Sequence, residues 1–89
     1  MKLLLSAHFK KDYQKLPQPI KRKVEKQLGI LVKNPLHPSL GVKKMKGKAG
    51  KYQFWEARVD YFWRMSFLKD KDEIRLCRLG PHDKVLKNR

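Results

Sequence analysis

The sequence predicts a single α+β domain in which an N-terminal strand and a helical hairpin pack on one face of an antiparallel sheet. Three observations predict this class: apolar residues at helical spacing in the first third of the chain, alternating residues in the second half, and a length of 89 residues that suits one core. The expected order is strand, helix, helix and then three strands. The whole chain, 1–89, is expected to form this one domain.

The first 35 residues carry the expected first strand and both helices. Residues 2–5 form a short apolar run, and Ser6 is a suitable N-cap for the helix that follows. The apolar residues of this helix recur at helical spacing as Phe9, Tyr13 and Leu16. Pro17 and Pro19 end it and begin a second helix, which Asn34-Pro35 ends. The apolar stripe of the second helix consists of Ile20, Val24, Leu28, Leu31 and Val32.

The second half of the chain changes to a period of two. Residues 36–50 combine Pro, Gly and several lysines with few strand signals, so we expect a connecting loop there. Strands are expected at 52–59, 62–68 and 73–79, separated by turns near Asp60 and at 69–72. One face of these strands meets the helical stripe through Trp55, Val59, Trp63, Met65 and Phe67. The other face is expected to be open.

The charge of the chain points to a polyanionic partner. Lys and Arg total 23 against 8 Asp and Glu, a formal charge of +15, which opposes compaction and which phosphate groups would relieve. We therefore favour nucleic acid over a merely solvated basic surface. No apolar run approaches the roughly 20 residues that span a bilayer, and residues 1–5 are too short for a signal peptide. We expect no membrane partner and a cytoplasmic location.

The residue types present limit the possible chemistry. Cys77 is the single cysteine, so it excludes an internal disulfide and is expected to be buried, and the three histidines are too scattered for a metal site. We expect neither a metal nor another cofactor. Cleaving RNA needs neither, because the ribose 2′-hydroxyl can attack the adjacent phosphate with the help of a base, an acid and cations. His82, Glu56 and Arg64 could supply those groups, with Arg58, Lys44 and Lys46 nearby.

Several motifs carry a resemblance to a known family. They are His37-Pro38-Ser39-Leu40, Lys46-Gly47, Trp55-Glu56-Ala57-Arg58-Val59, the strand around Arg64, and Arg78-Leu79-Gly80-Pro81-His82-Asp83-Lys84-Val85-Leu86. Over nearly the whole chain this pattern resembles the RelE/ParE superfamily of toxins from toxin-antitoxin pairs. The Gly-x-His-Asp ending is most similar to the YafQ-type branch of ribosome-dependent messenger RNA interferases, which implies that His82 is catalytic.

The resemblance implies partners and further site residues. The partners are messenger RNA in the ribosomal A site, ribosomal RNA and a cognate antitoxin. Arg64 matches an arginine that contacts the scissile phosphate in RelE, although the YafQ branch is apolar there. The C-terminal tyrosine of RelE is Leu86 in this chain, so the base must come from elsewhere, and Glu56 is a candidate. The RNA-binding residues are then Lys44, Lys46, Arg58 and Asp83.

Alternative interpretations remain at the level of the sequence. The ParE branch has the same fold but inhibits DNA gyrase without cutting RNA, and a plain RNA-binding protein is a third possibility. His82 could be a solvated side chain, Arg64 could pair with Glu56 across the hairpin, and Lys44 and Lys46 could form only a steering surface. Phe54 and Phe62 could stack on bases or belong to the core.

Overall fold

The computed structural model describes residues 1–87, except the side chains of Asp83, Leu86 and Lys87. The C-terminal segment 87–89, expected from sequence to fray, lies outside these residues apart from the backbone of Lys87. The elements follow in the order β1 (Lys2–Leu5), α1 (Ala7–Gln14), α2 (Gln18–Lys33), the 3-10 turn η1 (Pro38–Leu40), β2 (Lys43–Ala49), β3 (Tyr52–Arg58), β4 (Trp63–Lys69), β5 (Glu73–Pro81) and α3 (His82–Lys87). No helix among the described residues is long and apolar enough to cross a bilayer.

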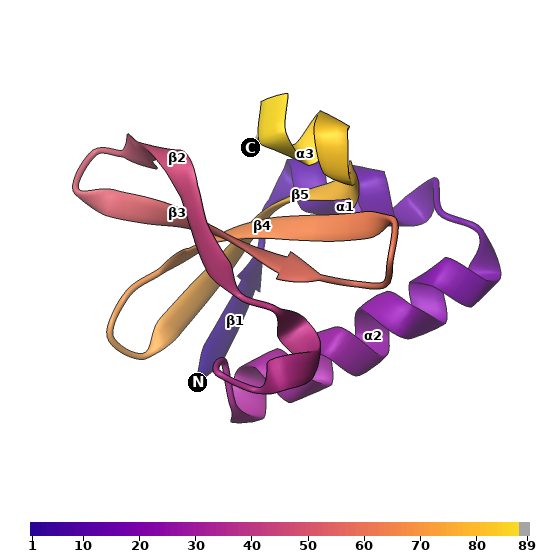
Figure 1. Cartoon of the computed structure of the whole chain (residues 1–89), viewed down its shortest axis with the longest axis horizontal. Helices are drawn as coiled ribbons and strands as arrows, with labels where there is room; N and C mark the ends of the chain where they lie inside the picture. The colour runs from indigo at the N-terminus through magenta and orange to yellow at the C-terminus, as the bar shows by residue number, and fades with distance from the viewer. Residues whose placement is uncertain (88–89) are drawn as a thin grey trace.

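The strands form one five-stranded sheet in the order β1-β5-β4-β3-β2 (Figure 1). β2 to β5 run antiparallel to their neighbours, whereas β1 pairs with β5 in parallel. The predicted α+β class is confirmed, but the sheet is mixed and not purely antiparallel. The difference arises at β1, which lies at the edge of the sheet beside the last strand of the chain.

The two N-terminal helices begin and end close to where the sequence predicts. The Ser6 hydroxyl oxygen accepts a hydrogen bond from the Phe9 N–H at 3.1 Å and donates to the Cys77 carbonyl at 2.9 Å, so the N-cap of α1 is also tied to β5. Pro17 is the N-cap of α2, with Pro19 in its first turn, and Asn34 follows its last residue. The predicted helical hairpin is therefore confirmed.

The core lies between the helices and one face of the sheet. Val24 and Leu31 of α2 are fully buried there, as expected from the apolar stripe. The strand residues predicted to face them are confirmed: Val59, Met65 and Phe67 are buried, and Trp55 and Trp63 pack against the cluster. Burial of this apolar area is the main stabilising contribution to the fold.

Two elements were missing from the expected fold. The stretch 36–50 is not a loop throughout, because 43–49 form the edge strand β2. Met45 is its one buried residue, and the exposed lysines that obscured the strand in the sequence are typical of a protected sheet edge. The second missing element is α3, which contacts β4 and β5. Its Val85 is 2% exposed and lies next to the Gly80 position on the face opposite the core, so that face is partly covered.

Candidate functional site

The candidate site lies at one end of the sheet, where β3 ends, β4 begins and β5 runs into α3. Arg58 pairs with Arg64 across β3 and β4, and Arg64 pairs with Gly80 across β4 and β5. Ala57 and Met65, the neighbours of the two arginines, point into the core. Since successive side chains of a strand point to opposite faces, Arg58 and Arg64 lie side by side on the other face.

His82 is joined to this end of the sheet. It is the first residue of α3, two positions after Gly80, and its side chain is half-buried. Its backbone N–H donates to the Phe62 carbonyl in the β3–β4 turn at 3.1 Å. The strand register and this hydrogen bond bring the backbone of His82 to the same end of the sheet as Arg64, and a shared site stays a prediction.

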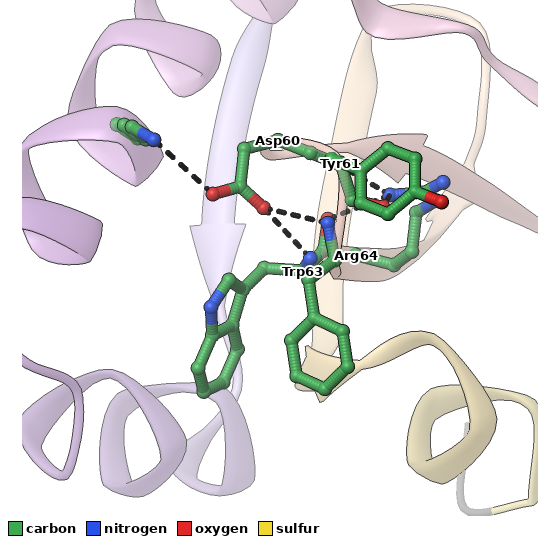
Figure 2. Close-up of polar contacts among 6 residues, drawn as sticks. Asp60, Tyr61, Trp63 and Arg64 are labelled. Atoms are coloured by element: carbon green, nitrogen blue, oxygen red, sulfur yellow. Dashed lines mark hydrogen bonds and ion pairs between the residues drawn. The ribbon is translucent and has the colours of Figure 1, made fainter.

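Arg64 is fixed by backbone carbonyls, as Figure 2 shows. Its Nη1 donates to the carbonyl oxygens of Asp60 at 2.6 Å, Tyr61 at 3.2 Å and Trp63 at 3.1 Å. The alternative considered from the sequence, an ion pair with Glu56, is not formed, and Glu56 pairs with Lys43 instead. Nε and Nη2 of Arg64 make no hydrogen bond with the described residues, so they can donate to a ligand oxygen.

Asp60 organises the turn that holds Arg64. One carboxylate oxygen, Oδ1, accepts from the N–H groups of Phe62 at 2.9 Å and Trp63 at 2.8 Å, and Oδ2 pairs with Lys23 of α2 at 3.2 Å (Figure 2). Partial burial alone would raise the pKa of Asp60, but these hydrogen bonds and the charge of Lys23 outweigh it and lower the pKa. Asp60 is therefore a structural anion of the turn.

Arg58 is held by its backbone and presents its side chain to solvent. Its carbonyl accepts from the buried Gln27 side chain of α2 at 2.8 Å, which fixes the end of β3. Its guanidinium passes close to Gly41, where an added Cβ would stand 3.5 Å from Nη2. Gly41 has a φ of 52°, in the left-handed region that favours glycine.

The other sequence-predicted residues lie on or beside β2. Glu56 is 2% exposed, and its closest cation is Lys43, whose Nζ lies 3.3 Å from Oε1 without hydrogen-bond alignment. Lys44 and Lys46 are exposed, and Lys44 pairs with Trp55 while Lys46 falls within an irregular part of the β2–β3 register. Sequence reasoning missed Lys43 because the strand register that places it opposite Glu56 was not expected.

The remaining predictions concern Asp83, Cys77 and metals. Asp83 lies in α3 beside His82, and its side chain is outside the described residues. Cys77 is half-buried rather than fully buried, and burial raises the pKa of its thiol. Across residues 1–87, no group of three or more His, Cys, Asp or Glu side chains is placed to hold a metal ion.

The arrangement is suited to phosphate. Arg58 and Arg64 occupy directly opposite positions on β3 and β4, and the backbone of His82 is bonded to the adjoining turn. Among the described residues no carboxylate forms an ion pair with either arginine. Guanidinium groups donate in a fork that matches phosphate oxygens, and an imidazole can exchange a proton near neutral pH. The residue types gathered at this end of the sheet are therefore those that a phosphodiester site would use.

Solved structures of toxins share the fold. No protein-family model matches the chain, and no curated protein is significantly similar. A chain of an archaeal RelE–RelB complex from Pyrococcus horikoshii is 22% identical with a TM-score of 0.74, over 90% of this chain and 92% of its own. A chain of the Escherichia coli DinJ–YafQ complex is 19% identical with a TM-score of 0.75, over 94% of both chains. A copper-bound toxin variant from Helicobacter pylori is 25% identical with a TM-score of 0.69, over 96% of this chain and 98% of its own.

The chain therefore shares its fold with toxins of toxin-antitoxin systems. In particular, the chain has the same fold as the RelE–RelB and DinJ–YafQ structures and as a YafQ from Escherichia coli. The resemblance expected from the sequence motifs is confirmed.

Proposed function

We propose that this protein is the toxin of a toxin-antitoxin pair and acts as a ribosome-dependent endoribonuclease on translated messenger RNA. The observation that carries the proposal is the pair Arg58 and Arg64, adjacent on one sheet face without a carboxylate partner among the described residues, next to the His82 turn. A phosphodiester would supply the missing negative charge.

The proposed reaction is an attack of the ribose 2′-oxygen on the adjacent phosphorus. The bond from phosphorus to the 5′-oxygen of the next nucleotide breaks, which leaves a cyclic phosphate and a free 5′-hydroxyl. Neutral His82 can take the 2′-hydroxyl proton and pass it to the leaving 5′-oxygen, so no proton is consumed. Arg58 and the free Nε and Nη2 of Arg64 would stabilise the extra negative charge that develops on the phosphate oxygens. No metal or other cofactor takes part.

The burial of Glu56 determines the role that we propose for it. A carboxylate that is 2% exposed has little access to solvent, but its charge lies 3.3 Å from the Lys43 ammonium. We assign Glu56 to the site as the group that holds Lys43 beside the phosphate. A Glu56→Gln variant should lower cleavage without altering the pH dependence of the reaction, whereas a Glu56 that itself acts as the base would remove one limb of the pH profile.

The lysines of β2 would dock the protein on RNA. Lys44 and Lys46 are exposed, which suits contacts with the phosphate backbone of ribosomal RNA or of messenger RNA in the A site. Asp83 adjoins His82 in the sequence, and we propose it as a further RNA-binding residue.

A cognate antitoxin is the expected protein partner. The similar structures from Pyrococcus horikoshii and Escherichia coli are complexes, RelE with RelB and YafQ with DinJ. An acidic or amphipathic segment of an antitoxin would neutralise a chain of charge +15 and cover the phosphate site.

The test is cleavage of messenger RNA on ribosomes. The purified protein is incubated with ribosomes carrying a messenger RNA and, separately, with naked RNA, beside a His82→Ala variant, and the fragment ends are mapped. The expected result is ribosome-dependent cutting that leaves cyclic or 3′ phosphate and that falls by about 100-fold or more in the variant. Intact message with the wild-type protein, together with inhibition of gyrase, would support a ParE-like inhibitor instead.

A further inference from the structure

Two exposed aromatic side chains lie at the turn between β3 and β4. Tyr61 is 95% exposed and Phe62 is 56% exposed. Rings of this size usually contribute to stability by burial, and a single exposed one is unremarkable. Here two consecutive rings are exposed at the same turn, so they contribute little to the core and are available to a ligand.

The turn that carries these rings is held from both sides. Asp60 accepts from the backbone N–H groups of Phe62 and Trp63, and Arg64 donates to the carbonyls of Asp60 and Tyr61 (Figure 2). The Phe62 ring also contacts the Trp63 ring edge-to-face, with centroids 5.7 Å apart and planes at 87°. A surface ordered before binding loses less conformational entropy when a ligand arrives.

The backbone of the two residues that carry the rings adjoins the proposed phosphate site. The Phe62 carbonyl accepts from the His82 N–H, and the Tyr61 carbonyl accepts from Arg64. In Figure 2 the Tyr61 ring and the Arg64 side chain extend to one side of the turn, while the Trp63 indole extends to the other. A nucleotide whose phosphate is held by the arginines would therefore have its base next to the exposed turn.

We propose that Tyr61 and Phe62 form a stacking platform for a base of single-stranded RNA next to the bound phosphate, an inference that rests on the proposed function. Every base has a π-face, so such a platform binds bases with little sequence preference and positions the nucleotide for reaction. Three cations belong to this region: Lys23 pairs with Asp60, and Arg58 and Arg64 occupy paired positions on β3 and β4. They favour a polyanion over an apolar protein surface.

The test uses variants that keep apolar bulk but remove the π-face. Tyr61→Leu combined with Phe62→Leu is compared with Tyr52→Leu, a matched control at the other end of β3 where the ring is 36% exposed. The probe is a short single-stranded RNA that carries 2-aminopurine, whose fluorescence is quenched by stacking. We expect the wild type and the control to quench the probe, and the double variant to lose the quench and bind roughly tenfold more weakly.

A second RNA with an abasic nucleotide shows whether the base is the group that is bound. The wild type and the double variant should bind this RNA equally, since the phosphates remain and the π-face has no partner. Equal quenching of 2-aminopurine by the wild type and the double variant would overturn the platform, even in a protein that cleaves messenger RNA. Quenching that depends on the two rings, in a protein that leaves ribosome-bound message intact, would support the platform and remove the endoribonuclease.

Discussion

Arg78 and Arg64 lie on neighbouring strands of the same sheet and have opposite electrostatic surroundings. Arg78 of β5 forms a bidentate ion pair with Asp12 of α1, with Nε to Oδ2 at 2.9 Å and Nη2 to Oδ1 at 3.2 Å. Asp12 also accepts from the Leu79 N–H at 3.0 Å. Among the described residues, Arg64 of β4 donates to backbone carbonyls alone, and its partner position on β3 is Arg58, a second cation.

The difference separates a cation that stabilises the fold from cations available to a ligand. At Asp12, burial would raise the pKa, but the hydrogen bonds and charge of Arg78 and the Leu79 N–H outweigh it and lower the pKa, while the pairing raises the pKa of Arg78. Arg58 and Arg64 occupy directly opposite positions on β3 and β4, where residues of like charge disfavour strand pairing. The protein therefore bears an electrostatic cost at the end of the sheet where we propose that phosphate binds.

Within this comparison, the largest effect is expected from removing Arg58, one of the two arginines without a carboxylate partner among the described residues. Arg58→Ala should lower messenger RNA cleavage by about 10- to 100-fold, because one of the two guanidinium groups on the phosphate is lost. The melting temperature should stay the same or rise slightly, since one of two like charges at opposite strand positions is removed.

The control for that variant is Arg75→Ala. Arg75 is an exposed arginine in the first half of β5, paired weakly with Glu73 at 3.8 Å, so it matches Arg58 in charge but lies away from the site. Equal losses of cleavage in the two variants would mean that overall charge, and not the arginine pair, supports the reaction.

The next prediction concerns Arg78, whose charge is neutralised by Asp12. Asp12→Asn should lower the free energy of unfolding by about 1–3 kcal/mol, because a charge-assisted bidentate contact between α1 and β5 is lost and Arg78 is left without its anion. Urea unfolding measures the change. At urea concentrations too low to unfold it, the variant should cleave at the wild-type rate. A loss of cleavage in the folded variant would place Asp12 in the reaction.

These contrasts show what the sequence could and could not predict. Apolar periodicity predicted the helical hairpin, three strands and the core around Met65 and Phe67, because burial determines those patterns. β2 was missed because Met45 alone is buried in it, and its lysines resemble a loop. His82 and Arg64 could be assigned to one site from motifs, but the contact of Glu56 with Lys43 and the exposure of Tyr61 depend on strand register and turn geometry, which one sequence does not contain.

A smaller effect is expected from acid. Asp12 and Asp60 both have a pKa lowered from the ordinary value of 3.8, so the unfolded chain binds protons more readily than the folded one. Their contribution to stability is present above about pH 4 and is lost as the pH falls through their folded values. Urea unfolding between about pH 6 and pH 2 should show this loss, and an Asp12→Asn, Asp60→Asn double variant should show a weaker dependence. An unchanged dependence in that variant would contradict the assignment.

The smallest effect concerns the lysines of β2. Lys44→Ala and Lys46→Ala should each weaken RNA binding slightly and reduce the slope of log affinity against log salt by about 0.7 to 1. A salt titration of RNA binding measures both values. A change in cleavage specificity from either variant would instead place that lysine against the reacting nucleotide.

We propose that nucleic acid binds at the end of the sheet where Arg58 and Arg64 have no carboxylate partner among the described residues. Amide resonances of the ¹⁵N-labelled protein, followed during titration with a short single-stranded RNA, test it residue by residue. We predict that the largest shifts occur at Arg58, at 61–64 and at His82, with small changes at Asp12 and Arg78. Shifts centred on α1 and Arg78, or spread evenly over the lysine-rich surface, would contradict it.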